Sequence, residues 1–308
     1  MTTSDDEYDG EDGAPEPQLL LWSVFLAEAT QSFKSAGFES PEIDARRIVE
    51  RASGFEGSEF PRGLEEPATE KAVRHFGDMV QRRLNEEPLQ YVCGVWGFRS
   101  LDLMVDNRVL IPRPETEVVV GVAIEELEKC LVGGRKLVAD LGTGSGAIGL
   151  SIAVETENTE VVLTDISPDA LQVARANLAG LGSLGTRVTI HQGSWFEALP
   201  EEYRRSFSLI VSNPPYVSSG EVDTLPANVK KWEPHQALVS GKKGTEFLEI
   251  VVDEAGEWLC QSGSLVLEMA PHHTSEISER MQEKGYTEVQ IFEDLTDRRR
   301  GVRGIWNS

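Results

Sequence analysis

The fold of this chain is decided by the stretch Val138-Ala139-Asp140-Leu141-Gly142-Thr143-Gly144-Ser145-Gly146, an apolar run that breaks into a glycine-rich turn. A helical pattern follows the turn, and the next apolar run ends at Asp165, 23 residues after Gly142. Glycines allow backbone conformations closed to other residues and let a ligand approach closely. A carboxylate at the end of the second strand can accept both hydroxyls of a ribose. The stretch therefore predicts a strand, a nucleotide-binding loop and a helix.

The same alternation of strand and helix continues through the C-terminal two thirds of the chain. The sequence predicts strands at 136–140, 160–165, 187–191, 207–212 and 264–269, and helices at 146–155, from 167 or 168 to about 181, and at 247–259. The last apolar runs, 288–292 and 302–306, can pair as an antiparallel edge hairpin. This rhythm predicts an α/β fold with a Rossmann-like, mostly parallel sheet, helices on both faces and an antiparallel edge strand.

The sequence upstream of this sheet predicts a small helical domain and a hairpin. One helix follows the apolar cluster at 19–26, a second opens at Pro41 after Ser40 as N-cap, and a third begins at Pro67. From 90 to 111, apolar residues alternate with polar or small ones, which is typical of a β-hairpin. We therefore expect a helical substrate-docking domain at 18–87, a hairpin linker at 88–112 and a catalytic domain at 113–308.

Composition and charge limit the class of protein. The 308 residues are 40% hydrophobic and 26% charged, with no 18-residue apolar run and no signal-peptide pattern, so we expect a globular protein without a membrane span. The formal net charge is −23. Seven acidic residues fall within 1–17, which is expected to be a disordered acidic tail, and about −16 remains elsewhere. Such a surface repels a phosphate backbone and attracts a basic protein, although acidity can equally maintain solubility or reflect a salt-adapted proteome.

The cysteines and histidines indicate no metal site. Cys93, Cys130 and Cys260 are far apart and form no CxxC pair, which fits a reducing cytoplasm. His272-His273 has no carboxylate or cysteine at a spacing that would complete a site. The short basic run Arg298-Arg299-Arg300 is expected in a solvated hairpin turn.

The glycine loop does not identify its cofactor by itself. Gly142, Gly144 and Ala147 also satisfy the dinucleotide pattern G-x-G-x-x-G/A. Asp140, just before the loop, favours S-adenosylmethionine because its carboxylate can hold the ammonium of a bound methionine moiety. The choice between NAD and S-adenosylmethionine requires a second motif.

That motif is Ser212-Asn213-Pro214-Pro215-Tyr216, at the end of a strand where ligands bind in open α/β sheets. Consecutive prolines fix the backbone and lack N–H groups, so their carbonyls stay free to accept. The Asn213 side-chain oxygen and the Pro214 carbonyl can hold the two N–H groups of a planar nitrogen, and Tyr216 can cover it. The motif predicts methyl transfer to a planar –NH₂ group, with Asn213, Pro214 and Tyr216 as catalytic residues and Pro215 beside them in the substrate site.

On these residues the chain resembles the HemK/PrmC family, protein-glutamine methyltransferases that act on class I peptide chain release factors. The resemblance covers nearly everything after residue 18. It rests on five segments: Pro88-Leu89-Gln90-Tyr91 with Gly94; Leu110-Ile111-Pro112-Arg113-Pro114-Glu115-Thr116-Glu117; Asp140 to Gly146; Asn213 to Tyr216; and Trp232-Glu233-Pro234 with Ala237-Leu238.

The resemblance implies a five-helix-type N-terminal domain, a hairpin linker and an S-adenosylmethionine-dependent catalytic domain that acts on the glutamine of a Gly-Gly-Gln loop. It also implies a set of cofactor-binding residues: Asp140, Gly142, Thr143, Gly144, Ser145, Gly146, Asp165, Ser194, Trp195 and Asn213. The family usually has an aspartate where this chain has Ser194, whose hydroxyl is a weaker acceptor for an adenine amino group. A cytoplasmic monomer is expected.

Two other functions remain open at this point. An adenine methyltransferase acting on nucleic acid would also use Asn-Pro-Pro-Tyr, because adenine presents a planar –NH₂ group, but it predicts a basic groove and a base-recognition domain. A non-catalytic adaptor that retains the cofactor fold is the second alternative. The intact glycine loop and the intact Asn213–Tyr216 motif speak against it.

Overall fold

A computed structural model describes residues 20–130 and 134–307, which form two compact units with the boundary between Glu86 and Glu87. The expected acidic tail at 1–17 lies outside the described residues. Each unit buries its own set of apolar side chains. None of the helices in the described ranges is long and apolar enough to cross a membrane.

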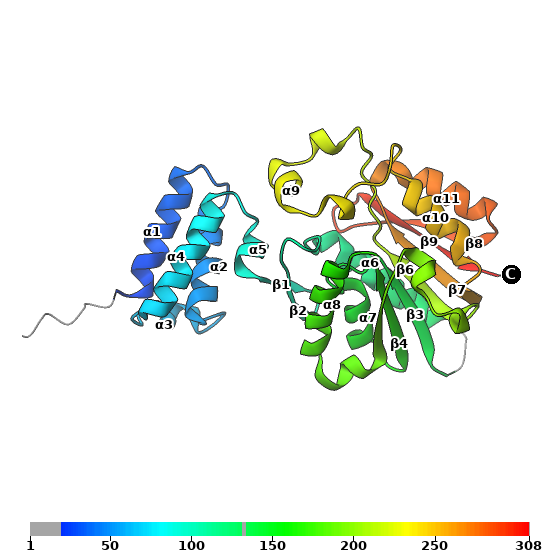
Figure 1. Cartoon of the computed structure of the whole chain (residues 1–308), viewed down its shortest axis with the longest axis horizontal. Helices are drawn as coiled ribbons and strands as arrows, with labels where there is room; N and C mark the ends of the chain where they lie inside the picture. Colours follow the sequence, from blue (N-terminus) through cyan, green and yellow to red (C-terminus); the bar gives the residue numbers. More distant parts are fainter. Residues whose placement is uncertain (1–19, 131–133, 308) are drawn as a thin grey trace, which may run out of the picture. The chain divides into compact units, whose positions relative to one another are not determined.

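The first unit is helical (Figure 1). Its helices are α1 (Trp22–Ser35), α2 (Pro41–Ser53), α3 (Phe60–Gly63) and α4 (Glu70–Leu84). The rings of Trp22, Phe25 and Phe76 meet at centroid distances of 5.4 to 6.0 Å and join α1 to α4. Arg83 Nε donates to the Asp44 carboxylate at 2.7 Å and ties α4 to α2. Aromatic packing and one cross-helix ion pair therefore hold this unit together.

Two local expectations for the N-terminal third are wrong. The third expected helix begins at Glu70 and not at Pro67, because the Thr69 hydroxyl caps it by accepting from Ala72 N at 3.3 Å. The alternating run at 90–111 opens with a short helix, α5 (Leu89–Cys93), and only β1 (Val95–Phe98) and β2 (Leu101–Met104) form the hairpin. α5 ends at Gly94, whose φ of 70° lies in the left-handed region that favours glycine.

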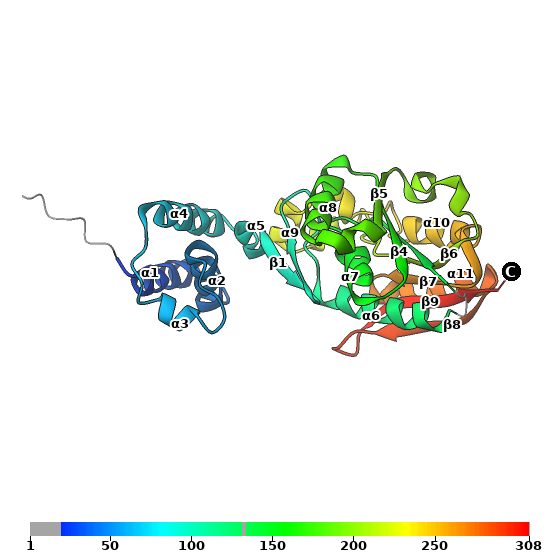
Figure 2. The same cartoon turned by 90° about the horizontal axis from the view of Figure 1, so that it is seen from below.

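The second unit is built on a seven-stranded sheet in the order β5-β4-β3-β6-β7-β9-β8 (Figure 2). Its strands are β3 (Lys136–Leu141), β4 (Thr159–Asp165), β5 (Val188–Gln192), β6 (Phe207–Ser212), β7 (Leu259–Glu268), β8 (Tyr286–Glu293) and β9 (Arg299–Trp306). Neighbours from β5 to β7 are parallel, and β9 pairs antiparallel with both β7 and β8. The prediction of a mostly parallel sheet with an antiparallel edge is confirmed.

Helices cover both faces of this sheet (Figure 1). They are α6 (Pro114–Lys129), α7 (Ala147–Glu155), α8 (Pro168–Gly180), α10 (Glu246–Ala255) and α11 (Thr274–Glu283), whereas the short α9 (Ala227–Trp232) belongs to the segment between β6 and α10. Residues of α6, α7 and α8 share one apolar core with the β1–β2 hairpin, and residues of α10 and α11 share the other. The expected helix at 247–259 ends four residues early. Trp258 and Leu259 are buried beneath the sheet, and β7 already begins at Leu259.

Helix α7 packs against the sheet at very short range. A Cβ atom on Gly149 would lie 2.2 Å from Leu163 Cδ2 on β4 and 3.0 Å from Asp140 Oδ2 on β3. Only a residue without a side chain fits between them. This contact fixes the N-terminal end of α7, and with it the glycine loop that precedes the helix.

Candidate active site

Two loops meet because the strands that carry them are neighbours with matched ends. Leu141, the last residue of β3, pairs with Ser212, the last residue of β6. The Ser212 hydroxyl also donates to the Leu141 carbonyl at 2.6 Å, and Ser212 is fully buried. The glycine loop at 142–146 and the Asn-Pro-Pro-Tyr segment at 213–216 therefore leave the sheet side by side.

The glycine loop uses left-handed backbone at three positions. Gly142, Gly144 and Gly146 have φ values of 72°, 57° and 87°, a region that costs other residues roughly 1–2 kcal/mol each. The loop is held by backbone hydrogen bonds. Thr143 N donates to the Thr164 carbonyl of β4 at 2.9 Å, and Gly146 N donates to the Thr143 carbonyl at 2.9 Å. Glycine is thus required for a tight turn that is anchored to the neighbouring strand.

Asp140 lies behind this loop and not on the surface of the site. Its side chain is completely buried, and Oδ2 accepts from the Thr143 hydroxyl at 2.5 Å and from Gly149 N at 2.9 Å. Burial raises the pKa of Asp140 to about 6, against the lowering effect of these two hydrogen bonds. The carboxyl shapes the loop from within, and its grip on a methionine ammonium stays a prediction.

Asp165, the last residue of β4, faces the site and also holds the loop. Its Oδ2 accepts from Gly144 N at 2.9 Å, and its Oδ1 accepts from Ser167 N at 2.9 Å at the start of α8. Burial raises the pKa of Asp165 above its ordinary value, while the backbone hydrogen bonds oppose this shift. Each carboxylate oxygen has lone pairs beyond the one already used. Ribose hydroxyls can therefore still find acceptors here.

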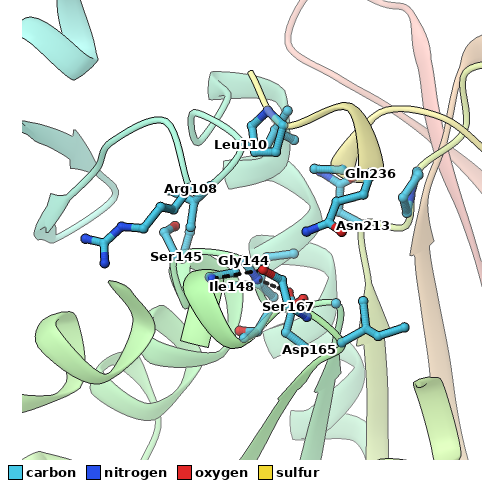
Figure 3. Close-up of a pocket in the computed structure, with 18 of the residues that line it drawn as sticks. Arg108, Leu110, Gly144, Ser145, Ile148, Asp165, Ser167, Asn213 and Gln236 are labelled. Atoms are coloured by element: carbon cyan, nitrogen blue, oxygen red, sulfur yellow. Dashed lines mark hydrogen bonds between the residues drawn. The ribbon is translucent and has the colours of Figure 1, made fainter. Parts of the chain in front are cut away.

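A cavity of about 320 Å³ opens between these loops. Figure 3 shows Gly144, Ser145 and Asp165 on one side of it and Asn213 and Gln236 on the other. Nine of the residues predicted for the site line it: Gly142, Thr143, Gly144, Ser145, Asp165, Ser194, Trp195, Asn213 and Pro215. Four others, Asp140, Gly146, Pro214 and Tyr216, do not line it, and their roles stay predictions.

One end of the cavity suits a flat base. The rings of Trp195 and Phe247 lie with centroids 5.2 Å apart and both line the cavity, as does Ile166, whose side chain is 62% exposed. A Cβ on Gly142 would lie only 3.6 Å from the Trp195 ring, so the loop and the ring stand close together. A volume of this size with apolar rings at one end and a carboxylate beside them fits a nucleoside. The residues present therefore fit S-adenosylmethionine.

Two segments, at 111–113 and 234–236, form part of the cavity wall, and Glu233 connects them. Glu233 is buried, its Oε1 accepts from the Arg113 guanidinium, and its Oε2 accepts from Ile111 N at 3.3 Å. Ile111 and Arg113 line the cavity on one side, and Pro234 and Gln236 line it on the other. The Glu233 carboxylate thus holds the two wall segments together.

The Asn-Pro-Pro-Tyr segment presents its first residue to the cavity. Asn213 Nδ2 lies 3.4 Å from the Thr116 hydroxyl oxygen in the first turn of α6. Pro214 is buried and Tyr216 is half-buried, and the Tyr216 carbonyl is 3.3 Å from His273 Nε2. Burial, together with the nearby Glu268 carboxyl, raises the pKa of the Tyr216 phenol above its ordinary value. The segment is held rigidly behind Asn213.

Sequence reasoning missed the roles of three polar residues behind this segment, Thr116, Glu268 and Arg300. The Thr116 hydroxyl donates to Glu268 Oε2 at 2.7 Å, and Glu268 is 1% exposed at the end of β7. Arg300 is expected in a solvated turn, but its side chain is mostly buried. Its Nη2 forms an ion pair with the buried Asp294 carboxylate at 3.0 Å. One signal was available, since Glu268 ends a strand on the same edge of the sheet as Asp165 and Ser212.

Family models match two parts of the chain. The model described as the PrmC N-terminal domain matches residues 25–94, and the model described as the methyltransferase small domain matches residues 122–230. Among the described residues, no cluster of three histidine, cysteine, aspartate or glutamate side chains could hold a metal ion.

Curated proteins similar to the chain extend over most of its length. A release factor glutamine methyltransferase of Rhodopirellula baltica is 35% identical over 284 residues, which are 91% of this chain and 95% of that protein. Proteins of the same description from Deinococcus radiodurans and Caulobacter vibrioides are 35% and 33% identical and cover 90% and 94% of this chain. These matches span 96% and 97% of the lengths of those two proteins.

Among solved structures, the catalytic domain of hMettl16 in complex with a MAT2A 3′UTR hairpin resembles the chain with a TM-score of 0.51. The two are 12% identical, and the match covers 95% of this chain and 93% of that one. At this identity the likeness concerns the fold alone. It agrees with the predicted Rossmann-like methyltransferase sheet, which the family models and the strand order confirm.

Proposed function

The chain belongs to the release factor glutamine methyltransferase family, and from this premise we propose that it methylates the side-chain amide of the glutamine in the Gly-Gly-Gln motif of class I peptide chain release factors. The methyl donor is S-adenosylmethionine, which supplies a methyl group on a positively charged sulfur. The chain is an enzyme, so the non-catalytic adaptor reading is set aside. The strongly acidic composition disfavours a nucleic acid substrate.

One observation carries this proposal. The Ser212–Leu141 hydrogen bond of 2.6 Å sets the donor loop at 142–146 and the acceptor segment at 213–216 on adjacent strand ends, and both contribute to one cavity. A methyl transfer needs the two reactants aligned within contact distance. Holding them in this way can lower the barrier by up to about 7–11 kcal/mol.

On the donor side, each proposed contact follows from a residue in the cavity. Trp195 and Ile166 would hold the adenine, with Ser194 as an acceptor for its amino group. Asp165 would hold the ribose hydroxyls, and the backbone of the glycine loop, with Asp140 beneath it, would hold the methionine portion. These contacts need no metal ion and no covalent nucleophile.

On the acceptor side, the obstacle is the low nucleophilicity of a planar amide nitrogen, whose lone pair is delocalised. The Asn213 side-chain oxygen accepts one N–H of the substrate amide, and the Pro214 carbonyl accepts the other. Two acceptors favour the positive charge that develops on the nitrogen as its bond to the methyl carbon forms and the bond from that carbon to sulfur breaks, after which the nitrogen loses one of its two protons to water. Tyr216 covers the flat group through its ring, and Pro215 lines the cavity beside it.

The proposed division of labour follows the expected domains. The helical domain at 18–87 docks the release factor, and the catalytic domain at 113–308 transfers the methyl group. The hairpin at 88–112 links the two domains. We also propose a monomer in the cytoplasm, whose reducing conditions fit the three isolated cysteines of the chain. A single species of about 34 kDa in light scattering is expected; a stable dimer contradicts this part.

Mass spectrometry tests the proposed reaction. The protein is incubated with S-adenosylmethionine and, in separate tubes, a full-length release factor or duplex DNA. We expect one methyl group on the Gly-Gly-Gln glutamine and none on DNA; methyl groups on adenine alone overturn the proposal. Asn213→Ala should abolish the product with circular dichroism unchanged, whereas Asn228→Ala, an exposed change on α9, should retain it. Full activity of Asn213→Ala contradicts the proposed grip on the amide.

A further inference from the structure

A line of polar contacts runs from the acceptor segment to the interior of the sheet. Asn213 Nδ2 lies 3.4 Å from Thr116 Oγ1, and Thr116 Oγ1 lies 2.7 Å from Glu268 Oε2. The three residues come from the end of β6, the first turn of α6 and the end of β7. Thr116 and Glu268 are both buried, at 4% and 1% exposure. Only Thr116 and Asn213 line the cavity.

While Glu268 is ionised, the chemistry of these groups fixes the direction of both hydrogen bonds. A threonine hydroxyl carries one proton, and an ionised carboxylate can only accept. The proton of Thr116 is therefore donated to Glu268, and the Thr116 oxygen can only accept from Asn213. Asn213 must then direct its –NH₂ group at Thr116. Its Oδ1 is left for a ligand in the cavity.

Positive charge surrounds the far end of this line. Arg300 is 12% exposed at its side chain, lies 3.0 Å from the Asp294 carboxylate and 3.7 Å from the Glu115 carboxylate, and attracts the Glu268 carboxylate. Arg113 has the same effect on Glu268. Burial is the largest effect and raises the pKa of Glu268, and Glu115 adds to it, while these two guanidinium groups act against that rise. A buried acid without such neighbours would be held in its neutral form.

We propose that Thr116 and Glu268 are positioning residues that hold the Asn213 amide with its oxygen toward the substrate nitrogen. This inference rests on the proposed function, because it gives Asn213 Oδ1 the role of accepting a substrate N–H. Without these two hydrogen bonds, the Asn213 side-chain amide can flip and direct its own –NH₂ group, in place of Oδ1, toward the substrate nitrogen. A donor facing the substrate –NH₂ repels it, so the oriented state is the active one.

The first test removes the hydroxyl from Thr116. Thr116→Val should lower kcat about ten- to hundredfold and leave the KM for S-adenosylmethionine within about twofold. Thr116→Ser should restore kcat, because it returns the hydroxyl. Thr164→Val is the matched control: Thr164 is buried on β4, outside the cavity lining, and its hydroxyl has no hydrogen-bond partner among the described residues. Wild-type kcat in Thr116→Val overturns the proposal.

A second variant covers the case in which Thr116→Val fails to fold. Glu268→Gln keeps the shape of the side chain and removes its charge, so it should fold. Its –NH₂ group can donate to Thr116, which frees the Thr116 proton to face Asn213. We expect kcat to fall about tenfold or more with an unchanged melting temperature or a higher one. A loss of stability with kcat unchanged assigns Glu268 a purely structural role and overturns the proposal.

A readout other than activity separates this inference from the proposed function. In protein labelled with ¹⁵N-asparagine, the side-chain –NH₂ signal of Asn213, assigned by its loss in Asn213→Ala, should exchange slowly with water. Thr116→Val should accelerate this exchange, and Thr164→Val should not. If the wild-type protein puts no methyl group on the glutamine, the proposed function fails, and the inference with it; if Asn213→Ala stays active, the grip of Asn213 on the amide and the inference fail while the reaction stands. If Asn213→Ala is inactive but Thr116→Val leaves both exchange and kcat unchanged, only the inference fails.

Discussion

The Asp165 carboxylate lies 2.9 Å from the backbone nitrogen of Gly144, so the residue that ends β4 holds the middle of the loop that follows β3. The same side chain accepts from Ser167 N and faces the cavity. A residue that sequence patterns suggest for ribose binding thus also holds the glycine loop in shape. Its replacement should affect both the ligand and the loop.

Asp165→Asn should weaken the binding of S-adenosylmethionine. The amide nitrogen cannot accept from a backbone N–H, so one of the two anchoring hydrogen bonds is lost. A hydrogen bond to a charged group contributes about 1.5–3 kcal/mol, which corresponds to a ten- to hundredfold higher Kd. Isothermal titration calorimetry measures this. Asp169→Asn, an exposed change in the first turn of α8, is the control and should bind normally. An unchanged Kd in Asp165→Asn would show that the carboxylate is not needed.

Glu233→Ala should loosen the part of the cavity wall that Glu233 holds together. It removes the acceptor for both Arg113 and Ile111 N, which line or border the cavity. We expect the Kd for S-adenosylmethionine to rise about tenfold and the melting temperature to fall, because a buried N–H loses its partner. Glu202→Ala, at an exposed position, should change neither value. Normal donor affinity in Glu233→Ala would refute the role assigned to this contact.

Two glycine-to-alanine changes should have opposite effects on stability. In Gly149→Ala, the new Cβ would lie 2.2 Å from Leu163, and such overpacking costs about 1–3 kcal/mol. In Gly77→Ala, within α4, nothing lies within 4 Å of the new Cβ, and alanine favours a helix by about 1 kcal/mol over glycine. Thermal unfolding should therefore shift down in the first variant and up in the second. Equal shifts would contradict the close contact of α7 with β4.

The pH dependence of stability and of catalysis should have opposite signs at Glu268. Burial is the main cause that raises the pKa of Glu268 to about 7, with Glu115 adding to it, while Thr116, Arg300 and Arg113 lower it. The folded state therefore binds the proton more tightly than the unfolded chain does. The stability gained is fully present below the ordinary value of 4.5 and is lost as the pH rises through about 7.

Catalysis should instead fall as the pH decreases through about 7, because the proposed orientation of Asn213 requires the charged form of Glu268. Rates of Glu268→Gln should be low and nearly independent of pH across this window. Single-turnover rates and melting temperatures between about pH 6 and pH 9 measure both trends. Asp140, with a pKa of about 6, contributes to stability with the same sign and remains in the variant. A wild-type rate that rises toward acid pH would refute the charged form as the active one.

The parts of the site that depend on local sequence could be predicted. A strand, a glycine turn and a helix follow one another within 138–155, and Asn213 directly follows β6, so their place at one edge of the sheet is a consequence of parallel topology. The antiparallel edge pair was also predictable, because the chain ends with two apolar runs a short turn apart. The edge pair joins neighbours in sequence, and the parallel order of the strands brings the two loops together.

The remaining features depend on contacts between distant segments. Thr116 and Glu268 are 152 residues apart, and no local pattern relates a hydroxyl in a first helical turn to a carboxyl at the end of a strand. The complete burial of Asp140 and its bond from Gly149 N depend on the packing of α7, which no local pattern shows. Arg300 is expected in solvent from the sequence, but its ion pair with the Asp294 carboxylate keeps its side chain mostly buried. The packing of distant elements decides these roles.

The bond between Ser212 and Leu141 has a consequence for how this scaffold could be altered. The loops for donor and acceptor share one anchor but no residues, since each begins after it. Replacing the segment after Ser212 could therefore redirect the transferred methyl to a different nitrogen compound while leaving the donor loop untouched. Replacing Ser212 itself should disturb both loops at once, which makes this serine the position to conserve when such a scaffold is retargeted.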